Sequence, residues 1–165
     1  MIQVRPAVSD TDRNWLRTVW VEDWGGDSMV TRGRVHHLRD LPGLIAWQGD
    51  ERVGAATYCL EEGACELMSL NALSQGQGVG TLLLTAVEEA ARQAGCSRVW
   101  LITSNDNLDA VRFYQRRGYR LVAVYPGAVD EARKVKPTIP LVGFHGIPLH
   151  DDWELEKRLA TASGR

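Results

Sequence analysis

Residues 74–90 read SQGQGVGTLLLTAVEEA, a glycine-rich loop that runs straight into a predicted helix. Gly76, Gly78 and Gly80 stand at alternate positions, so no Cβ keeps a ligand away from the main chain there. The N-terminus of the helix that follows directs free N–H groups and the positive end of its dipole at this loop. The stretch therefore predicts an anion site, whose natural occupant is a phosphate or a pyrophosphate.

The glycine spacing separates this loop from two other kinds of nucleotide loop. A dinucleotide loop reads Gly-x-Gly-x-x-Gly with an acidic residue about 20 positions further on. Here the third glycine comes one residue early, and residues 95–98 contain no acid. A P-loop needs Gly-Lys-Ser/Thr, which is absent. The pattern that fits is Gln/Arg-x-x-Gly-x-Gly/Ala at residues 75–80, although a turn that only caps a core helix would look the same.

Hydrophobic periodicity predicts an α+β fold along the rest of the chain. The expected helices begin at Ser9 or Asp10 and end at Gly25, span 28–37 and 79–94, and run from Asn105 or Asp106 to 116–118. The expected strands are 2–5, 44–47, 52–60, 64–73, 99–103 and 119–125, with a hairpin turn at 48–51. Residues 153–159 fit a strand or a helical turn, and we take them as a strand closing against 119–125.

A second motif follows one strand after the glycine loop and its helix. Residues 107–119 read NLDAVRFYQRRGY, which is Asn-x-x-Ala-x-x-x-Tyr-x-x-x-Gly-aromatic. The two motifs together, over about residues 66–125, resemble the signatures of the GCN5-related N-acetyltransferase (GNAT) superfamily. The resemblance implies the acyl-CoA N-acyltransferase fold, a mixed and largely antiparallel sheet with helices on both faces and a splayed central strand pair.

The resemblance also implies where acetyl-CoA, the cosubstrate, binds. Pantetheine would pair with the main chain of the strand before the loop, and the loop would hold the pyrophosphate. Gln75 stands where an arginine is commoner, which removes one charge beside the phosphates. The implied set is Leu70, Asn71, Ala72 and Leu73 for pantetheine, Gln75, Gly76, Gln77, Gly78, Val79, Gly80 and Thr81 for pyrophosphate, and Asn107 and Ala110 for the pantetheine arm.

Two side chains are candidates for proton transfer, since the family generally uses direct attack by an amine in a ternary complex. Tyr114 would protonate the departing sulfur as general acid, or it simply packs its ring in the core. Glu66 would act as general base, or it is a solvated or ion-paired strand residue. If the strand is regular, Ser69 and Asn71 point to the face opposite Glu66.

The acceptor side is the part that the motifs do not cover. Trp20 and Trp24 stand four apart near the end of the first predicted helix, where they would line an acceptor pocket or pack in the core. Ser69 and His145 are further candidates for binding the acceptor. The expected acceptor is a primary amine of a small molecule or peptide. An acyl-CoA-binding sensor without catalysis and a dinucleotide-binding oxidoreductase are the alternatives.

Length and composition favour a single domain over residues 1–165. Four of the six prolines lie in an insertion at about 126–150, with a short helix predicted at 129–135, and residues 161–165 are expected to fray. The net charge of −2 favours neither nucleic acid nor membrane as partner. The three cysteines fit reduced thiols of a cytoplasmic protein, and no histidine has metal-ligand spacing. A homodimer is left open.

Overall fold

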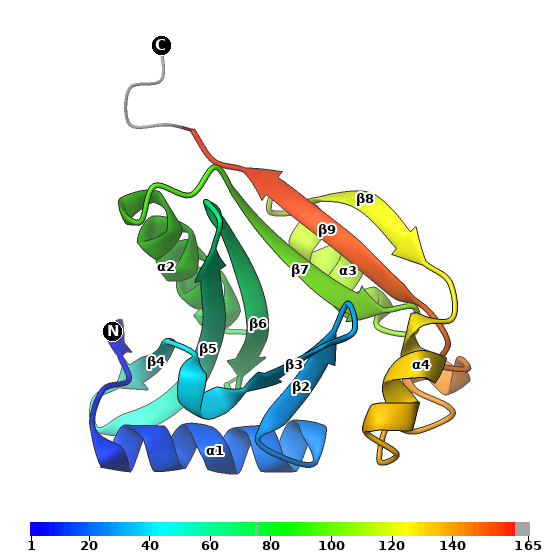
Figure 1. Cartoon of the computed structure of the whole chain (residues 1–165). Coiled ribbons are helices and arrows are strands. Elements are labelled where there is room, and N and C mark those ends of the chain that lie inside the picture. Colours follow the sequence, from blue (N-terminus) through cyan, green and yellow to red (C-terminus); the bar gives the residue numbers. More distant parts are fainter. Residues whose placement is uncertain (75, 161–165) are drawn as a thin grey trace. The chain divides into compact units, whose positions relative to one another are not determined.

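A computed structural model of the chain describes residues 1–74 and 76–160, so Gln75 and the predicted fraying at 161–165 lie outside the described residues. Its contacts divide the chain into two units. The first holds Met1–Asp27, His37–Val99 and residues 158–160, and the second holds Ser28–His36 and Trp100–Lys157. Figure 1 labels most helices and strands of both units.

The first unit is built on four antiparallel strands, in the order β1-β4-β5-β6. These are β1 (Ile2–Pro6), β4 (Gly43–Gln48), β5 (Glu51–Glu61) and β6 (Ala64–Ala72), with helices α1 (Asp10–Trp24) and α2 (Val79–Gln93) and the short 3₁₀ turn η1 (Leu38–Asp40). The predicted strands, the hairpin between β4 and β5, and both helices are confirmed. Ser9 caps α1 by accepting from the Asp12 N–H at 3.1 Å, as its sequence predicts.

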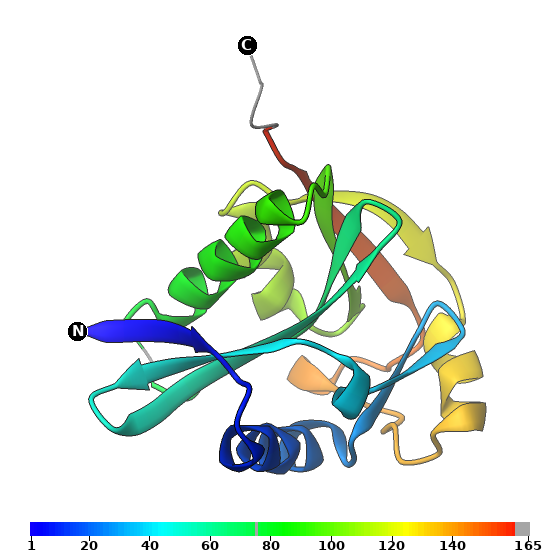
Figure 2. The ribbon, with the colours of Figure 1, turned by 60° about the vertical axis from the view of Figure 1, so that its left-hand side comes forward.

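Two glycines show how α1 and α2 approach opposite faces of this sheet. A Cβ on Gly43 would lie 2.7 Å from Cδ1 of Leu16 in α1. A Cβ on Gly54 would lie 2.6 Å from Cγ1 of Val79 in α2. Gly43 pairs with Thr57, three residues from Gly54, so the two glycines face opposite sides. Helices therefore cover both faces of this sheet, as predicted (Figure 2).

The second unit opens with a hairpin where the sequence predicted a helix. Residues 28–37 form β2 (Ser28–Thr31) and β3 (Arg34–His37), so the predicted helix over this range is wrong. Arg32 and Gly33 connect the strands with φ of 50° and 76°. Positive φ at both central residues is the geometry of a two-residue hairpin turn, which ends any helix. The β-branched residues on either side then pair as strands.

The rest of the second unit contains three neighbouring strands and two helices. The strands are β7 (Arg98–Ser104), which starts in the first unit, β8 (Arg120–Tyr125) and β9 (Asp152–Arg158), in the order β7-β9-β8. The helices are α3 (Leu108–Gln115) and α4 (Ala128–Val135), followed by the turn η2 (Phe144–Gly146). The strand assignment of residues 153–159 and its pairing with 119–125 are confirmed, because β9 pairs antiparallel with β8. The helix at 129–135 is confirmed as α4.

The cap of α3 differs from the prediction. Asn107, rather than Asn105 or Asp106, is the N-cap residue, and its side chain accepts from the Ala110 N–H at 3.4 Å. The two earlier residues instead bind the chain after α4, which explains why a local capping rule misplaced the start. Among residues 1–74 and 76–160, no helix has the length and apolar character needed to cross a bilayer.

Candidate active site

The glycine loop leads into α2 with its main chain open to a ligand. Gly76 and Gly78 have φ of 77° and 73°, and a Cβ on either would meet no atom within 4 Å. Gly78 is the N-cap of α2 and supplies no side-chain cap, and the first turn carries no acidic residue. The N-terminal N–H groups of this 15-residue helix are therefore not capped by the side chain of Gly78, and no acidic residue of the first turn competes with a bound anion. This geometry fits a pyrophosphate group.

Buried contacts hold the start of α2 in place behind that loop. Val79 and Leu83 are 1% and 0% exposed, and both would touch a Cβ placed on Gly54 of β5. The helix N-terminus is thus packed directly against the sheet rather than presented on a loose segment. Gln77 is exposed on the loop, and Gln75 lies outside the described residues.

A β-bulge in β6 changes the expected direction of its polar side chains. Leu67 pairs with Tyr58 and Ser69 with Thr57, so Met68 is an extra residue on this strand. Glu66, Ser69 and Asn71 pair with Cys59, Thr57 and Ala55, which alternate along β5 and share one face. The expectation that Ser69 and Asn71 face away from Glu66 is wrong, because it assumed a regular strand. All three lie on the face covered by α1.

Hydrogen bonds to α1 confirm that orientation. The Trp20 indole N–H donates to Ser69 Oγ at 3.3 Å, and this oxygen lies 2.5 Å from Thr57 Oγ1. The Asn71 amide donates to the carboxylate of Asp23 in α1, whose pKa is raised by partial burial and by Glu22. The amide oxygen of Asn71 is buried and accepts no hydrogen bond from the described residues. Glu66 is also buried, with 6% exposed.

The two tryptophans were predicted either to line an acceptor pocket or to pack in the core, and they differ in burial. Trp20 is 1% exposed and packs edge-on against Trp24, with ring centroids 5.9 Å apart. Core packing is therefore confirmed for Trp20, whereas Trp24 is partly exposed. Trp20 contacts Ser69 through its indole nitrogen.

Tyr114 lies in an aromatic cluster of the second unit. Its ring packs edge-on against Phe113 at 5.2 Å and Tyr119 at 5.6 Å between centroids. The side chain is buried, and this burial raises the pKa of the phenol far above its ordinary value. Tyr114 therefore keeps its proton at neutral pH and is available only as a donor or as a neutral acceptor.

The cysteines have the character of structural thiols. Cys65 is fully buried, and burial raises its pKa to about 12, with Cys96, Cys59 and Glu66 adding to the effect. Burial also raises the pKa of the Cys96 thiol. Because the thiolate is the nucleophilic form, Cys65 is not poised to form an acyl-enzyme. All three cysteines are free.

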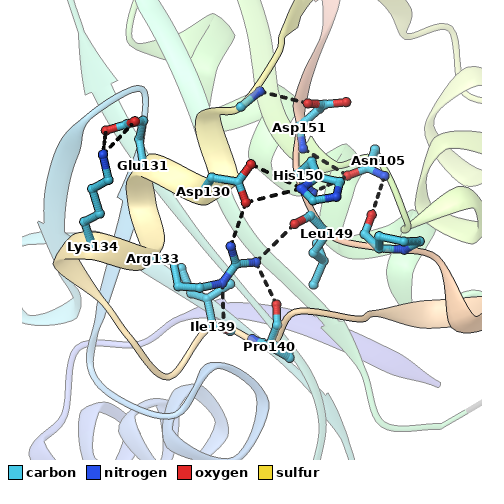
Figure 3. Close-up of polar contacts among 12 residues, drawn as sticks. Asn105, Asp130, Glu131, Arg133, Lys134, Ile139, Pro140, Leu149, His150 and Asp151 are labelled. Atoms are coloured by element: carbon cyan, nitrogen blue, oxygen red, sulfur yellow. Dashed lines mark hydrogen bonds and ion pairs between the residues drawn. The ribbon is translucent and has the colours of Figure 1, made fainter.

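The proline-rich insertion is tied down by residues whose role the sequence did not reveal (Figure 3). The Asn105 side chain accepts from the His150 and Asp151 N–H groups at 3.1 and 3.0 Å and donates to the Pro148 carbonyl at 2.9 Å. Asp106 accepts from the Phe144 N–H at 2.8 Å. His145 has a φ of 61° and its Nε2 lies 3.5 Å from a carboxylate oxygen of Asp109. The insertion is thereby attached at the end of β7 and the start of α3.

Arg133 of α4 lies within the same segment and hydrogen-bonds three of its main-chain carbonyls. Its guanidinium donates to the carbonyls of Ile139, Pro140 and Leu149 at 2.9–3.1 Å, and to Asp130 at 2.8 Å. The hydrogen bond from Arg133 lowers the pKa of the Asp130 carboxyl, and His150 adds to this. In the sequence, the prolines of this segment indicated a long ordered loop. The main-chain groups of such a loop need hydrogen-bond partners, and Arg133 is one of them.

The predicted site residues fall in both units. The glycine loop, Leu70–Leu73, Glu66, Ser69, Trp20 and Trp24 belong to the first unit. Asn107, Ala110, Tyr114 and His145 belong to the second. In the part of the chain that the structure describes, no three His, Cys, Asp or Glu side chains gather around a common point as metal ligands would.

Comparison with known proteins identifies the family. The model of the Acetyltransferase (GNAT) family matches residues 12–119. The chain is 42% identical over 137 residues to the uncharacterized protein YxbD of Bacillus subtilis (strain 168), covering 82% of this chain and 86% of that protein. It is 39% identical over 141 residues to the uncharacterized protein YdhI of the same strain, covering 85% and 88%. These matches confirm the resemblance drawn from the two motifs.

The fold is shared with solved enzymes of this kind. A GNAT family acetyltransferase from Elizabethkingia anophelis, whose crystal structure has acetyl-CoA bound, superposes with a TM-score of 0.71 at 17% identity over 96% of this chain and 98% of that one. The predicted acyl-CoA N-acyltransferase fold is confirmed. The chain belongs to the GNAT family of acetyltransferases. Its acetyl donor is acetyl-CoA.

Proposed function

We propose that this protein transfers the acetyl group of acetyl-CoA to a primary amine of a small molecule or peptide, by direct attack in a ternary complex. The observation that carries the proposal is the open main chain of Gly76 and Gly78 at the uncapped N-terminus of α2. It supports pyrophosphate binding through N–H groups, with Gln77, Val79, Gly80 and Thr81 completing the loop. The main chain of Leu70–Leu73 would pair with pantetheine, and Asn107 and Ala110 would contact its arm.

The chemistry needs one group that accepts a proton and one that donates a proton. In this proposal Glu66 takes a proton from the ammonium form of the acceptor, directly or through water, so that the neutral amine can attack. The amine nitrogen bonds to the thioester carbon and the carbon–sulfur bond breaks, while Tyr114 supplies a proton to the departing sulfur. The second proton that the nitrogen loses on becoming an amide returns to Tyr114, directly or through water, so that the phenol is restored. The assignment of Tyr114 as the donor rests on its place in the second motif; the raised pKa shows only that the phenol is neutral at pH 7. The raised pKa of Cys65 favours direct attack over a cysteine acyl-enzyme.

The acceptor contacts are proposals of the same kind. Trp24 is the exposed member of the tryptophan pair, and the polar group formed by Ser69 and Asn71 lies on the same face of the sheet. His145 stands half-exposed on the insertion, with 50% of its side chain accessible. A homodimer and a cytoplasmic location stay predictions from the sequence.

The test measures acetyl-CoA binding by calorimetry and thiol release with a panel of primary amines. Gly78→Ala places a methyl group in the loop, and we expect acetyl-CoA affinity to fall about tenfold. Gly95→Ala is the matched control, since Gly95 has a similar φ of 79° and equally open surroundings at the other end of α2. It should strain the backbone equally and leave affinity unchanged.

Two results would contradict the proposal. Equal losses of affinity in Gly78→Ala and Gly95→Ala would show that the loop does not hold the donor. Binding of acetyl-CoA without thiol release on any amine would favour the non-catalytic sensor instead.

A further inference from the structure

Arg32 occupies a turn position that its residue type does not favour. It is the first central residue of the β2–β3 hairpin and has a φ of 50°, followed by Gly33 at 76°. Asn, Asp and Gly are the residues usually found with positive φ in such turns. An arginine there is not explained by the backbone, so its side chain is the feature to account for.

The Arg32 guanidinium lies among two aromatic rings and a carboxylate of the second unit. Its central carbon is 5.6 Å from the ring centroid of Trp100 and 5.5 Å from that of Tyr125. Its Nη1 is 3.9 Å from Oε1 of Glu154, and the same oxygen accepts from the Tyr125 hydroxyl at 2.7 Å. The Glu154 side chain is 7% exposed, whereas that of Arg32 is 50% exposed.

This arrangement has the chemistry of a cation-binding site. Aromatic faces within about 6 Å attract a cation, and a buried carboxylate supplies the opposite charge. Asp152 pairs with Tyr125 and lies two residues before Glu154, so both carboxylates are on one face of β9. Burial and the neighbouring Asp151 raise the pKa of Asp152 to about 6, which still leaves it mostly ionised at pH 7. Two negative charges thus face this side of the strand.

Arg32 is a loosely held occupant of that site. A separation of 3.9 Å is beyond hydrogen-bond distance, and half of the side chain is already in water. Release of the guanidinium to solvent would break two cation–π contacts and one long ion pair, and a ligand cation at the same place would restore them. A cation that reached Glu154 directly would make a shorter, charge-assisted hydrogen bond there.

We propose that Trp100, Tyr125 and Glu154 bind the guanidinium group of a small-molecule ligand, which takes the place of the Arg32 guanidinium. The ligand class is a guanidinium compound, because a guanidinium is the group that these two rings and this carboxylate already contact. Arg32 acts as an internal competitor. A ligand displaces it only if the ligand is a cation that binds these groups more strongly than the Arg32 guanidinium does.

The experiment measures binding to the full chain by calorimetry, with no acetyl transfer required. The probes are agmatine, which has an amine and a guanidinium, 1-butylamine, which lacks the second cation, and 4-aminobutyrate, which carries a carboxylate instead. The variants are Arg32→Ala, Arg32→Ala combined with Glu154→Gln, and the control Arg39→Ala, at an exposed arginine of η1. Thermal unfolding verifies that each variant is folded.

We expect Arg32→Ala to bind agmatine about tenfold more tightly than the unaltered protein, because the competitor is gone. Glu154→Gln in the Arg32→Ala background should remove that gain, and Arg39→Ala should change nothing. If the Glu154 variant does not fold, Trp100→Leu in the same background gives the equivalent test.

Opposite outcomes would overturn the inference. Agmatine affinity that is unchanged or weaker in Arg32→Ala would show that Arg32 does not compete with a cation. Binding of 4-aminobutyrate that is lost in Arg32→Ala would show that Arg32 itself holds an anionic group of a ligand. Because these are binding measurements, failure here is distinct from failure of thiol release, which tests the proposed function.

Discussion

Tyr114 is the general acid in the mechanism that we propose. Burial raises its pKa, so the hydroxyl stays protonated through the neutral range. We expect Tyr114→Phe to lower kcat by roughly 100-fold, the usual effect of losing a general acid, with acetyl-CoA affinity nearly unchanged. Steady-state thiol release and calorimetry measure the two quantities. Tyr119→Phe is the control, since Tyr119 packs against Tyr114 in the same cluster. An unchanged kcat in Tyr114→Phe would remove this residue from the mechanism.

Asp152 makes the stability of the protein depend on pH. Its pKa rises from the usual 3.8 to about 6, first because of burial and second because of Asp151. The folded state therefore binds the proton more tightly than the unfolded chain, and stability falls as pH rises from about 4 through 6. Asp152→Asn removes the charge, so this variant should be the more stable protein at pH 7 and above.

The size of that effect follows from the shift. A change of about two pKa units corresponds to roughly 2.7 kcal/mol, and partial contact with water reduces the expected gain to about 1–2 kcal/mol. Urea unfolding at pH 4 and at pH 7.5 measures it, with Asp50→Asn in the β4–β5 turn as control. A gain of equal size at both pH values would mean that ionisation of Asp152 is not the cause.

At the scale of elements, Gly54 sets how closely α2 packs on β5. A Cβ there would lie 2.6 Å from Val79 Cγ1 and 2.7 Å from the main-chain oxygen of Asn71, which cannot move aside as a side chain can. We expect Gly54→Ala to lower the free energy of unfolding by about 1–3 kcal/mol through overpacking. Gly26→Ala is the matched control, because a Cβ on Gly26 meets nothing within 4 Å. Equal urea midpoints for the two variants would contradict the close approach.

The sequence predicted elements well where one periodic signal dominated. The apolar spacing of residues 79–94 identified α2, and the apolar run at 99–103 identified β7. The run did not reveal that buried and partly exposed residues alternate along β7. Residues 28–37 have no clear period, and their turn contains Arg32 where Asn or Gly would have marked a hairpin. The bulge at Met68 is likewise set by pairing with β5 rather than by local sequence.

At the scale of the whole molecule, acetyl-CoA binding should stabilise the folded state. A ligand at 100 times its Kd raises the free energy of unfolding by about 2.7 kcal/mol if it binds only the folded protein. We therefore expect a higher Tm with acetyl-CoA and no change with NAD, since the glycine spacing does not fit a dinucleotide loop. Thermal unfolding with each ligand at matched concentration measures this. Stabilisation by NAD and not by acetyl-CoA would contradict this prediction.

The sequence by itself determined the family and the donor. Both depend on local motifs, because main-chain N–H groups at a glycine loop and a helix N-terminus need only neighbouring residues to form a pyrophosphate site. Only the tertiary structure decided which side chains share a face or a cluster. The bulge in β6 places Glu66 and Ser69 on one face of the sheet, and the hairpin places Arg32 beside Trp100, Tyr125 and Glu154. The Arg32 contacts join residues up to 122 positions apart (Arg32 to Glu154), and their geometry comes from strand register and packing, which no local pattern encodes.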